Sequence, residues 1–271
     1  MSAEKVLRVL CLGDVVGRPG RSALKYGVPV LRQQLKIDLV IVNGENAAGG
    51  IGIDAKTAEE IRKAEVDIIT LGDHAWHKKE AAALMESSAA FLIRPANYPP
   101  QAPGRGWTIW KGGAETRVGV LNVLGRIFLN SPLDCPFRVT EALLVNELKE
   151  CSIIICDIHA EATSEKAAFA RYFDGRMSLI VGTHTHVPTA DEVLLPGGTG
   201  FISDLGMCGS LDGVIGMDRQ AAVERFLSGL PRSYEVAKGQ GVLQGVVCEI
   251  DCFTGKAVRL ERIRFADGAG D

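Results

Sequence analysis

Five short apolar runs in this chain end in residues whose side chains can bind a metal ion. They are rich in β-branched residues and read as buried strands: Val6 to Leu12, Asp38 to Val42, Val66 to Leu71, Ser152 to Cys156 and Met177 to Val181. In the first half of the chain, helical patterns alternate with these strands, as they do in α/β proteins. Because open α/β sheets bind ligands at the carboxyl ends of their strands, the sequence predicts an α/β fold with one functional edge.

The residues at these strand ends carry carboxylate, amide and imidazole groups. They are Asp14, Glu45, Asn46, Asp73, His74, His159, His184 and His186. A single Asp after Gly is usually a turn residue, and a single His near a strand end is usually only a satisfied polar group. Here five strand ends carry such residues, and four of the five histidines in the chain are among them, so the pattern instead indicates a metal site.

The run from Val181 to His186 is the centre of this prediction. In extended backbone, residues two apart point to the same face, so we expect His184 and His186 to converge on one point. Mixed carboxylate and imidazole ligands suit Fe or Mn, and Zn is also compatible.

The rest of the chain predicts helices between these strands and more antiparallel strands towards the C-terminus. The helices are expected over Ser22 to about Lys36 with a kink or break at Pro29, Asp54 to Ala64, Lys78 to Met85, Thr140 to Glu150, Ser164 to Tyr172 and Asp218 to Phe226. A β-hairpin is expected around Gly112 and Gly113. No repeat or linker divides the chain, so we expect a single domain over residues 1–271, with two sheets packed face to face and helices outside.

Composition excludes some classes of protein. A net charge of −3 argues against a nucleic-acid binder that depends on phosphate contacts, although a small local basic patch stays open. Seven scattered cysteines without a Cys-x-x-Cys pair indicate a reducing compartment and no zinc ribbon. The N-terminus lacks the apolar region of a signal peptide, and no apolar run approaches the ~20 residues of a membrane helix. We therefore expect a soluble, cytoplasmic protein without a membrane partner.

The order of these motifs resembles that of the calcineurin-like metallophosphoesterases. The resemblance rests on Gly13-Asp14, Gly44-Glu45-Asn46, Gly72-Asp73-His74 and Gly182-Thr183-His184-Thr185-His186. The chain is more closely similar to the small bacterial branch of YmdB-like cyclic-nucleotide phosphodiesterases, through Gly13 to Arg21, Asn43 to Ala48, Arg94 to Asn97, Asp157 to Lys166 and Gly216 to Arg219. This resemblance covers essentially the whole chain.

The resemblance implies a four-layer αββα sandwich of two mixed sheets flanked by helices, with two divalent metal ions. It implies that the first ion is held by Asp14, Glu45, Asn46 and His186. Glu45 would bridge to the second ion, which Asp73, His159 and His184 would complete. His74 would be the catalytic general acid, assisting metal-bridged hydroxide in the hydrolysis of 2′,3′-cAMP or 3′,5′-cAMP.

Asp73 departs from the family pattern, which usually has Asn at this place. An additional carboxylate beside Asp14 and Glu45 lowers the positive charge that reaches substrate and water. The hypothesis is tighter metal binding, weaker Lewis acidity and slower turnover than in a relative with Gly-Asn-His.

Other readings stay open at this point. A phosphomonoesterase or nucleotidase fits the same small-molecule phosphoester chemistry, and a metal-binding regulatory scaffold that acts through an RNA-processing partner is the alternative that is not an enzyme. The segments from Tyr98 to Gly106 and from Met207 to Asp218 are expected to shape the choice of substrate. Exposed C-terminal strands favour a homo-oligomer. Arg18, Arg94 and Arg126 are weaker candidates for binding phosphate, and Trp76 and Tyr98 are weaker candidates for stacking on a base. Structural roles explain these five residues at least as well.

Overall fold

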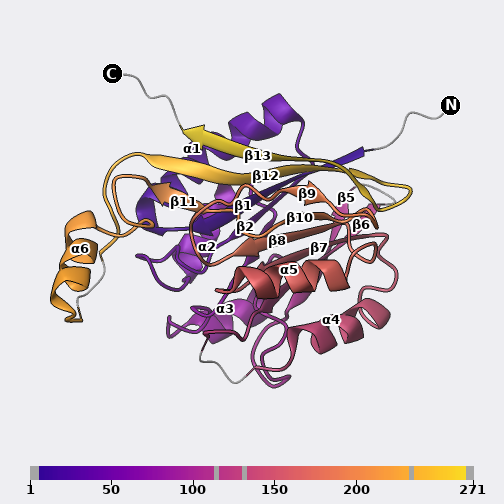
Figure 1. Ribbon diagram of the computed structural model, residues 1–271, viewed down its shortest axis with the longest axis horizontal. Helices are drawn as coiled ribbons and strands as arrows, with labels where there is room; N and C mark the ends of the chain where they lie inside the picture. Colours follow the sequence, from indigo (N-terminus) through magenta and orange to yellow (C-terminus); the bar gives the residue numbers. More distant parts are fainter. Residues whose placement is uncertain (1–5, 113–115, 130–132, 232–234, 267–271) are drawn as a thin grey trace.

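Two mixed β-sheets lie face to face between layers of helices (Figure 1). The protein is seen here as a computed structural model that describes residues 6–112, 116–129, 133–231 and 235–266. This arrangement confirms the predicted α/β sandwich of two sheets flanked by helices.

The first sheet has seven strands in the order β13-β12-β11-β1-β2-β3-β4. Strand β1 is central, because it pairs in parallel with β2 and β11 and antiparallel with β12. The bounds are β1 Val6–Val15, β2 Leu39–Asn43, β3 Ile68–Thr70, β4 Leu92–Ile93, β11 Met207–Ser210, β12 Gly241–Asp251 and β13 Ala257–Ala266. Asp14 stands opposite both Asn43 and Met207, so the carboxyl ends of β1 and β2 share one edge with the start of β11.

The second sheet has six strands in the order β5-β6-β7-β8-β10-β9. Strands β6, β7, β8 and β10 are parallel, and β5 and β9 pair antiparallel at the two edges. The bounds are β5 Trp107–Gly112, β6 Thr116–Leu124, β7 Ile153–His159, β8 Leu179–Thr183, β9 Val193–Leu194 and β10 Gly200–Ile202. The predicted hairpin is confirmed as β5 and β6, and its turn lies outside the described residues.

Alternation along the strands builds the layers. In β1, Val9 and Cys11 face the second sheet and join a core that also contains Ile155 and Val181. Their neighbours Leu10 and Leu12 face the other way, into a core shared with the helices. Successive side chains of a strand point to opposite faces, so one apolar run seals two interfaces.

The helices cover the outer faces of both sheets. Helices α1, α2 and α3 pack on the first sheet, and α4 and α5 lie over the second. The bounds are α1 Gly17–Leu35, α2 Ala55–Lys63, α3 Ala81–Ser87, α4 Pro136–Val145, α5 Thr163–Tyr172 and α6 Arg219–Ser228. Helix α6 projects at the far left of Figure 1, away from both sheets.

Helices α1, α3 and α4 each have at least one end that differs from prediction by three residues or more. Helix α1 begins at Gly17 rather than Ser22, because a proline at position 19 is tolerated in the first helical turn, where a missing N–H costs no hydrogen bond. It runs through Pro29 to Leu35 as one helix. Helix α4 begins at Pro136 and ends at Val145, earlier than the predicted span.

The histidine run after β8 is not extended, which corrects the argument made from the sequence. Strand β8 ends at Thr183, and His184 and His186 have φ of +105° and +63°. Their side chains are therefore directed by a strained turn, and they do not share one face of a strand.

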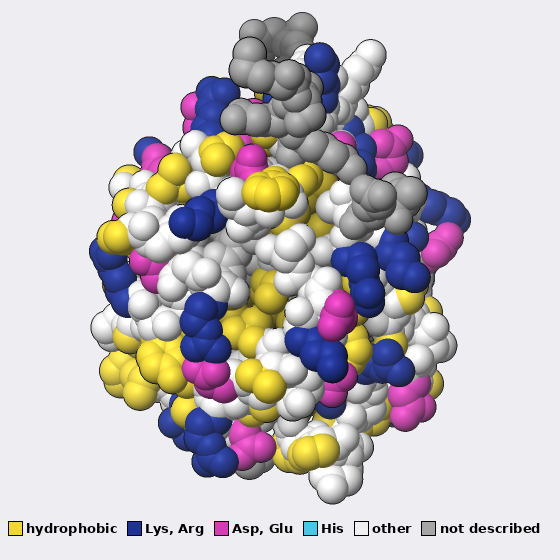
Figure 2. All heavy atoms as spheres, turned by 90° about the vertical axis from the view of Figure 1, so that its right-hand side faces the viewer, with side chains coloured by type: hydrophobic (Ala, Val, Ile, Leu, Met, Phe, Trp, Pro, Cys, Tyr) yellow, Lys and Arg dark blue, Asp and Glu magenta, His cyan; other side chains and the backbone are white. Residues whose placement is uncertain are grey.

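The strand ends that carry the candidate ligands lie together. They are not on the face shown in Figure 2, where no histidine side chain is visible. Among the described residues, no helix combines the length and the apolar composition that crossing a lipid bilayer requires. The single domain over residues 1–271 and the homo-oligomer stay predictions.

Candidate metal centre

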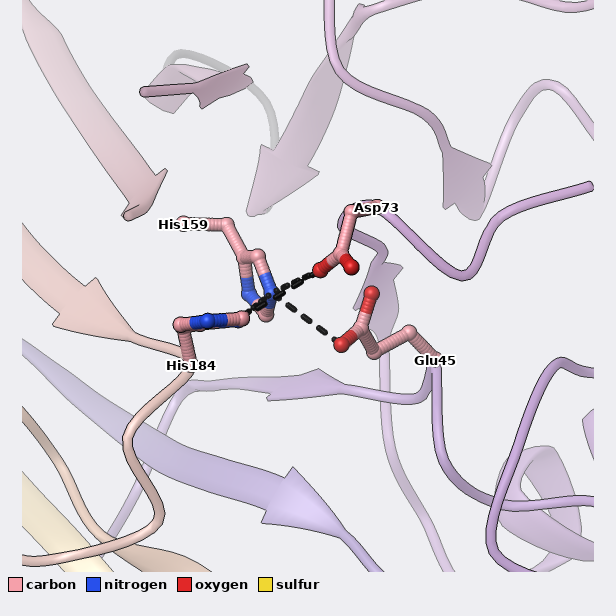
Figure 3. A group of neighbouring side chains, drawn as sticks. All are labelled: Glu45, Asp73, His159 and His184. Atoms are coloured by element: carbon pink, nitrogen blue, oxygen red, sulfur yellow. Dashed lines mark hydrogen bonds and ion pairs between the residues drawn. The ribbon is translucent and has the colours of Figure 1, made fainter. Parts of the chain in front are cut away.

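Four predicted ligands meet between the two sheets. Glu45, Asp73, His159 and His184 each direct one ligand atom into a space where all four atoms lie within 4.8 Å of one another (Figure 3). His159 Nε2 is 3.0 Å from Glu45 Oε1, 3.1 Å from Asp73 Oδ1 and 3.0 Å from His184 Nδ1. Two carboxylates and two imidazoles at such distances make a ligand set for a divalent transition metal.

The backbone is shaped to bring these groups together. Gly72 lies directly under them, since a Cβ atom on it would be 2.3 Å from Glu45 Oε2 and 2.4 Å from His159 Nε2. The N–H of Glu45 donates to Asn43 Oδ1 at 3.1 Å, which turns the chain at the end of β2. Strand β3 can therefore end close enough to β2 for Asp73 to face Glu45.

A second group of predicted ligands adjoins the first. His186 Nε2 lies 3.1 Å from Asn46 Nδ2 and 3.8 Å from Asp14 Oδ1, and Asn46 Nδ2 lies 3.4 Å from Glu45 Oε1. His186 Nδ1 donates to the carbonyl of Ile215 at 2.9 Å, so its Nε2 is the nitrogen left to bind a metal. Glu45 thus borders both groups.

The buried carboxylate of Asp14 indicates, from this structure alone, that the donors fit a cation. Asp14 is fully buried, and its Oδ1 has no hydrogen-bond partner among the described residues. A buried, unpaired carboxylate oxygen costs free energy unless positive charge compensates it. A metal ion between Asp14, Asn46 and His186 would supply that charge.

The pKa shifts of the buried groups also favour a bound cation. Burial raises the pKa of Asp14, against the influence of His186 and His159. Burial alone would also raise the pKa of Glu45, but the charge and hydrogen bond of His159 hold it below its ordinary value. Burial disfavours a charged His159, yet Glu45 and Asp73 together raise its pKa well above the ordinary value. The carboxylates therefore demand a cation at this point, and a divalent metal would displace the proton from His159.

His74 lies beside these four side chains and is not a member of their group. Its backbone N–H donates to Glu45 Oε2 at 3.0 Å, and its ring Nδ1 is 3.3 Å from Asp73 Oδ2. The ring is partly exposed and borders the cavity described below, where a substrate atom can reach it.

A buried network behind His159 was missed by the sequence reasoning. The hydroxyl of Thr183 donates to Asp157 Oδ1 at 2.7 Å and lies 2.8 Å from His159 Nδ1. Since that hydroxyl proton is used, Thr183 accepts from Nδ1–H and leaves Nε2 for a metal. Burial raises the pKa of Asp157 to about 6, opposed by His159, Thr70 and Thr183. The signal was available, because Asp157 is two residues before His159 on the same face of β7.

Glu161, which lies in the motif Asp157 to Lys166, is a second residue of the centre that the sequence did not identify. Its Oε2 lies 3.1 Å from His184 Nε2, on the side of the ring away from the other ligands. A carboxylate that holds the outer nitrogen of a ligating imidazole fixes its orientation and tautomer. Glu161 therefore directs His184 Nδ1 towards Asp73 and His159.

A cavity of about 670 Å³ opens over the centre. One wall carries polar side chains of the centre, including Glu45, Asn46, His74, His184 and His186. The apolar wall of the cavity comes from Ile51, Val214, Ile215, Met217, Ala222 and Phe226. Of the two segments expected to shape substrate choice, 207–218 contributes to this wall, and none of the described lining residues belongs to Tyr98 to Gly106.

The weaker candidates are mostly structural. Arg94 is buried and donates to backbone carbonyls, including those of Pro95, Ala102 and Pro103. Trp76 and Tyr98 pack edge to face with ring centroids 5.6 Å apart. Arg126 is exposed, and it does not line the cavity over the described part of the site.

Comparison with known proteins places this geometry in a family. Residues 10–263 match the family described as YmdB-like protein. A 2′,3′-cyclic-nucleotide 2′-phosphodiesterase of Bacillus subtilis is 46% identical over 96% of this chain and 98% of its own length. The crystal structure of a hypothetical protein from Thermus thermophilus is 41% identical with a TM-score of 0.88, covering 96% of this chain and 99% of that one.

A second solved structure extends the likeness. The crystal structure of a novel phosphatase from Mycoplasma pneumoniae is 35% identical with a TM-score of 0.91, over 97% of this chain and 94% of that one. These relatives confirm the predicted resemblance and the predicted class, a metal-dependent phosphoester hydrolase. The chain belongs to the YmdB-like protein family.

Proposed function

We propose that this protein is a phosphodiesterase that hydrolyses 2′,3′-cyclic nucleotides with two divalent metal ions. The observation that carries the proposal is the position of Glu45, whose Oε1 is 3.0 Å from His159 Nε2 and 3.4 Å from Asn46 Nδ2. A carboxylate that borders two ligand groups could serve as a ligand to both ions when they are bound. The Bacillus subtilis relative named for this reaction supports the choice of substrate.

The ligands divide into the two sets implied by the family pattern. Asp14, Asn46 and His186 would hold one ion, and Asp73, His159 and His184 the other, with Glu45 shared. Fe or Mn suits this mixture of carboxylate, amide and imidazole donors, and Zn is compatible with it. When bound, the ions supply an acidified water as nucleophile and positive charge for the phosphoryl oxygens.

A side chain of the protein protonates the leaving oxygen. With the ions bound, that water would have lost one proton, so hydroxide would bond to phosphorus as the P–O2′ bond breaks, and O2′ would take its proton from His74. The product is a nucleoside 3′-monophosphate. A general acid placed in this way contributes ~10²–10⁴-fold to the rate. The backbone N–H of His74 donates to Glu45, which holds this residue beside the proposed ligands, so the imidazole and the ions would act on one phosphate.

The cavity fits a nucleotide in size and polarity. Its volume of about 670 Å³ lies within the ~300–1,000 Å³ that small-molecule sites occupy. The wall around Ile215, Met217 and Phe226 offers an apolar surface to a base while the phosphate lies at the metal centre. A wall of this kind forms few directional bonds, so we expect moderate base specificity. The 3′,5′-cyclic nucleotides are a second candidate substrate for the same cavity.

A phosphomonoesterase is the alternative that a relative supports, because the structure from Mycoplasma pneumoniae is titled a phosphatase. The purified protein should be analysed for metal and tested on 2′,3′-cAMP, 3′,5′-cAMP and a nucleoside monophosphate. We expect a ratio of two ions per chain and hydrolysis of 2′,3′-cAMP to the 3′-monophosphate that a chelator abolishes. His74→Ala should lower turnover by ~10²-fold or more with the metal content unchanged.

Faster release of phosphate from the monophosphate than ring opening would favour the phosphatase. Bound metal without turnover on any of the three would contradict the enzyme and favour the regulatory scaffold.

A further inference from the structure

A basic groove lies beside the metal centre between α1 and α2. We use this name for two adjoining cavities that share Arg18, Arg21 and Ser22. The first, of about 580 Å³, is lined by Arg18, Arg21, Ser22, Lys25, Lys56, Glu60 and Lys63. The second, of about 660 Å³, lies between the start of α1 and the segment 236–241, and it adds Lys238.

Positive charge in this groove exceeds what its carboxylate can balance. Arg21 pairs with Glu60 at 2.6 Å and also donates to the carbonyl of Ala47. Within the described part of the chain, Arg18, Lys25 and Lys56 have no carboxylate within ion-pair distance, and all three are exposed. Because the whole chain carries a net charge of −3, this concentration is a local feature and not a general one.

The Arg and Lys side chains of the groove form a row along the two helices, which we call the track. Arg18, Arg21 and Lys25 are three and seven residues apart on α1, which places them on one face of the helix. Lys56 is the second residue of α2 and Lys63 is its last, and both line the same groove. Both helices start near the edge where the strands end, so the track runs from the metal centre towards the far side of the sheet.

The groove opens next to the active-site cavity at Gly49. This residue lines both the cavity over the metal centre and the cavity beside the segment 236–241. It is exposed, and a Cβ atom added to it would meet nothing within 4 Å. No side chain at position 49 therefore separates a ligand in one cavity from a ligand in the other.

We propose that the groove binds the RNA strand upstream of a terminal 2′,3′-cyclic phosphate, so that oligoribonucleotide 3′ ends are substrates. The inference rests on the proposed function. A 2′,3′-cyclic phosphate is the end group left when a 2′-hydroxyl displaces the next nucleotide of an RNA chain. The class of reaction that supplies this substrate is then transesterifying RNA cleavage. The terminal nucleotide occupies the cavity with its O5′ towards Gly49, and the preceding phosphates meet Arg18, Lys25 and Lys56.

The test compares one reaction on substrates of different length. The metal-loaded protein is given a cyclic 2′,3′-mononucleotide and oligouridylates of two, four and eight nucleotides that end in the same group. We expect kcat/KM to rise with length and to level off at about four nucleotides, because the groove neutralises about three phosphates. Raising salt from 50 to 200 mM should reduce the advantage of the octamer roughly 20-fold, from a slope of about −0.7 per phosphate.

A charge reversal localises the effect. Lys25→Glu combined with Lys56→Glu should lower kcat/KM for the octamer at least tenfold and leave the mononucleotide within twofold. The matched control is Lys111→Glu combined with Lys149→Glu, two exposed lysines that do not line the groove, with no change on either substrate.

Equal kcat/KM for mononucleotide and octamer at low salt would overturn the inference and leave the proposed function intact. Equal losses in both double variants would also overturn it. A protein that opens neither substrate would instead refute the proposed function.

Discussion

The ammonium of Lys166 lies 2.8 Å from Asp204 Oδ2, and both side chains are buried. The same carboxylate accepts from the N–H of Thr185 at 3.2 Å through Oδ2 and from that of Gly206 at 2.9 Å through Oδ1. Thr185 stands between His184 and His186, the two predicted ligands. The ion pair therefore supports the strained turn 184–186 from behind, and the geometry of the metal centre depends on it.

This pair predicts a large loss of stability from one substitution. Lys166→Met should lower the free energy of unfolding by about 3–5 kcal/mol, because it leaves Asp204 buried without a cation. Lys166→Met combined with Asp204→Asn should recover part of that loss, since the amide keeps an oxygen for the backbone N–H groups. Urea unfolding curves measure both values. A double variant no more stable than the single one would show that charge pairing is not the cause.

Asp73→Asn tests the departure from the family pattern. We expect metal affinity to fall about tenfold, because a ligand loses its charge, and turnover to rise because the centre becomes more positive. Metal competition with a chelator and kcat measured at saturating metal separate these effects. Asp134→Asn, an exposed aspartate that belongs to neither ligand group, is the control. Unchanged affinity and unchanged kcat in Asp73→Asn would contradict the hypothesis.

Glu161 should act on the metal through His184. Glu161→Ala removes the acceptor 3.1 Å from His184 Nε2, and we expect metal affinity to fall by about 10–100-fold. Glu161→Gln keeps an oxygen acceptor and should retain most of the affinity. Calorimetric titration of the metal-free protein gives both values, with the exposed Glu147→Gln as control. Equal losses in the alanine and glutamine variants would mean that charge, and not orientation, is what Glu161 provides.

The cysteines predict a simple labelling pattern. Burial raises the pKa of Cys208 and of Cys248 to about 12, and burial also raises those of Cys11, Cys151 and Cys156. A raised pKa removes the reactive thiolate, which at pH 8 is about one part in 10⁴ for a thiol of pKa 12.

We therefore expect iodoacetamide at pH 8 to label only Cys135 and Cys252 in the native protein, both partly exposed, and all seven thiols after unfolding. Mass spectrometry of peptides counts the labels. Rapid native labelling of Cys208 would contradict its burial in the core.

The sequence by itself determined the class of fold and most of the centre. Apolar runs that end near Asp14, Glu45, Asp73 and His159 became β1, β2, β3 and β7, because the pattern of a strand depends only on local residues. Ligands bind at the carboxyl ends of strands in open α/β sheets, so the same runs also indicated the location of the site. The sandwich of two sheets followed from the same patterns and from the family resemblance.

Only the tertiary structure decided how the groups meet. His184 and His186 reach the two neighbouring ligand groups through a turn with positive φ angles, which the ion pair of Lys166 with Asp204 supports, and not through an extended strand. Asp157 became part of the site because Thr183 of a neighbouring strand bridges it to His159. The basic groove formed because α1 and α2, separate in sequence, pack side by side. These relationships join residues far apart in the chain, and local periodicity carries no record of them.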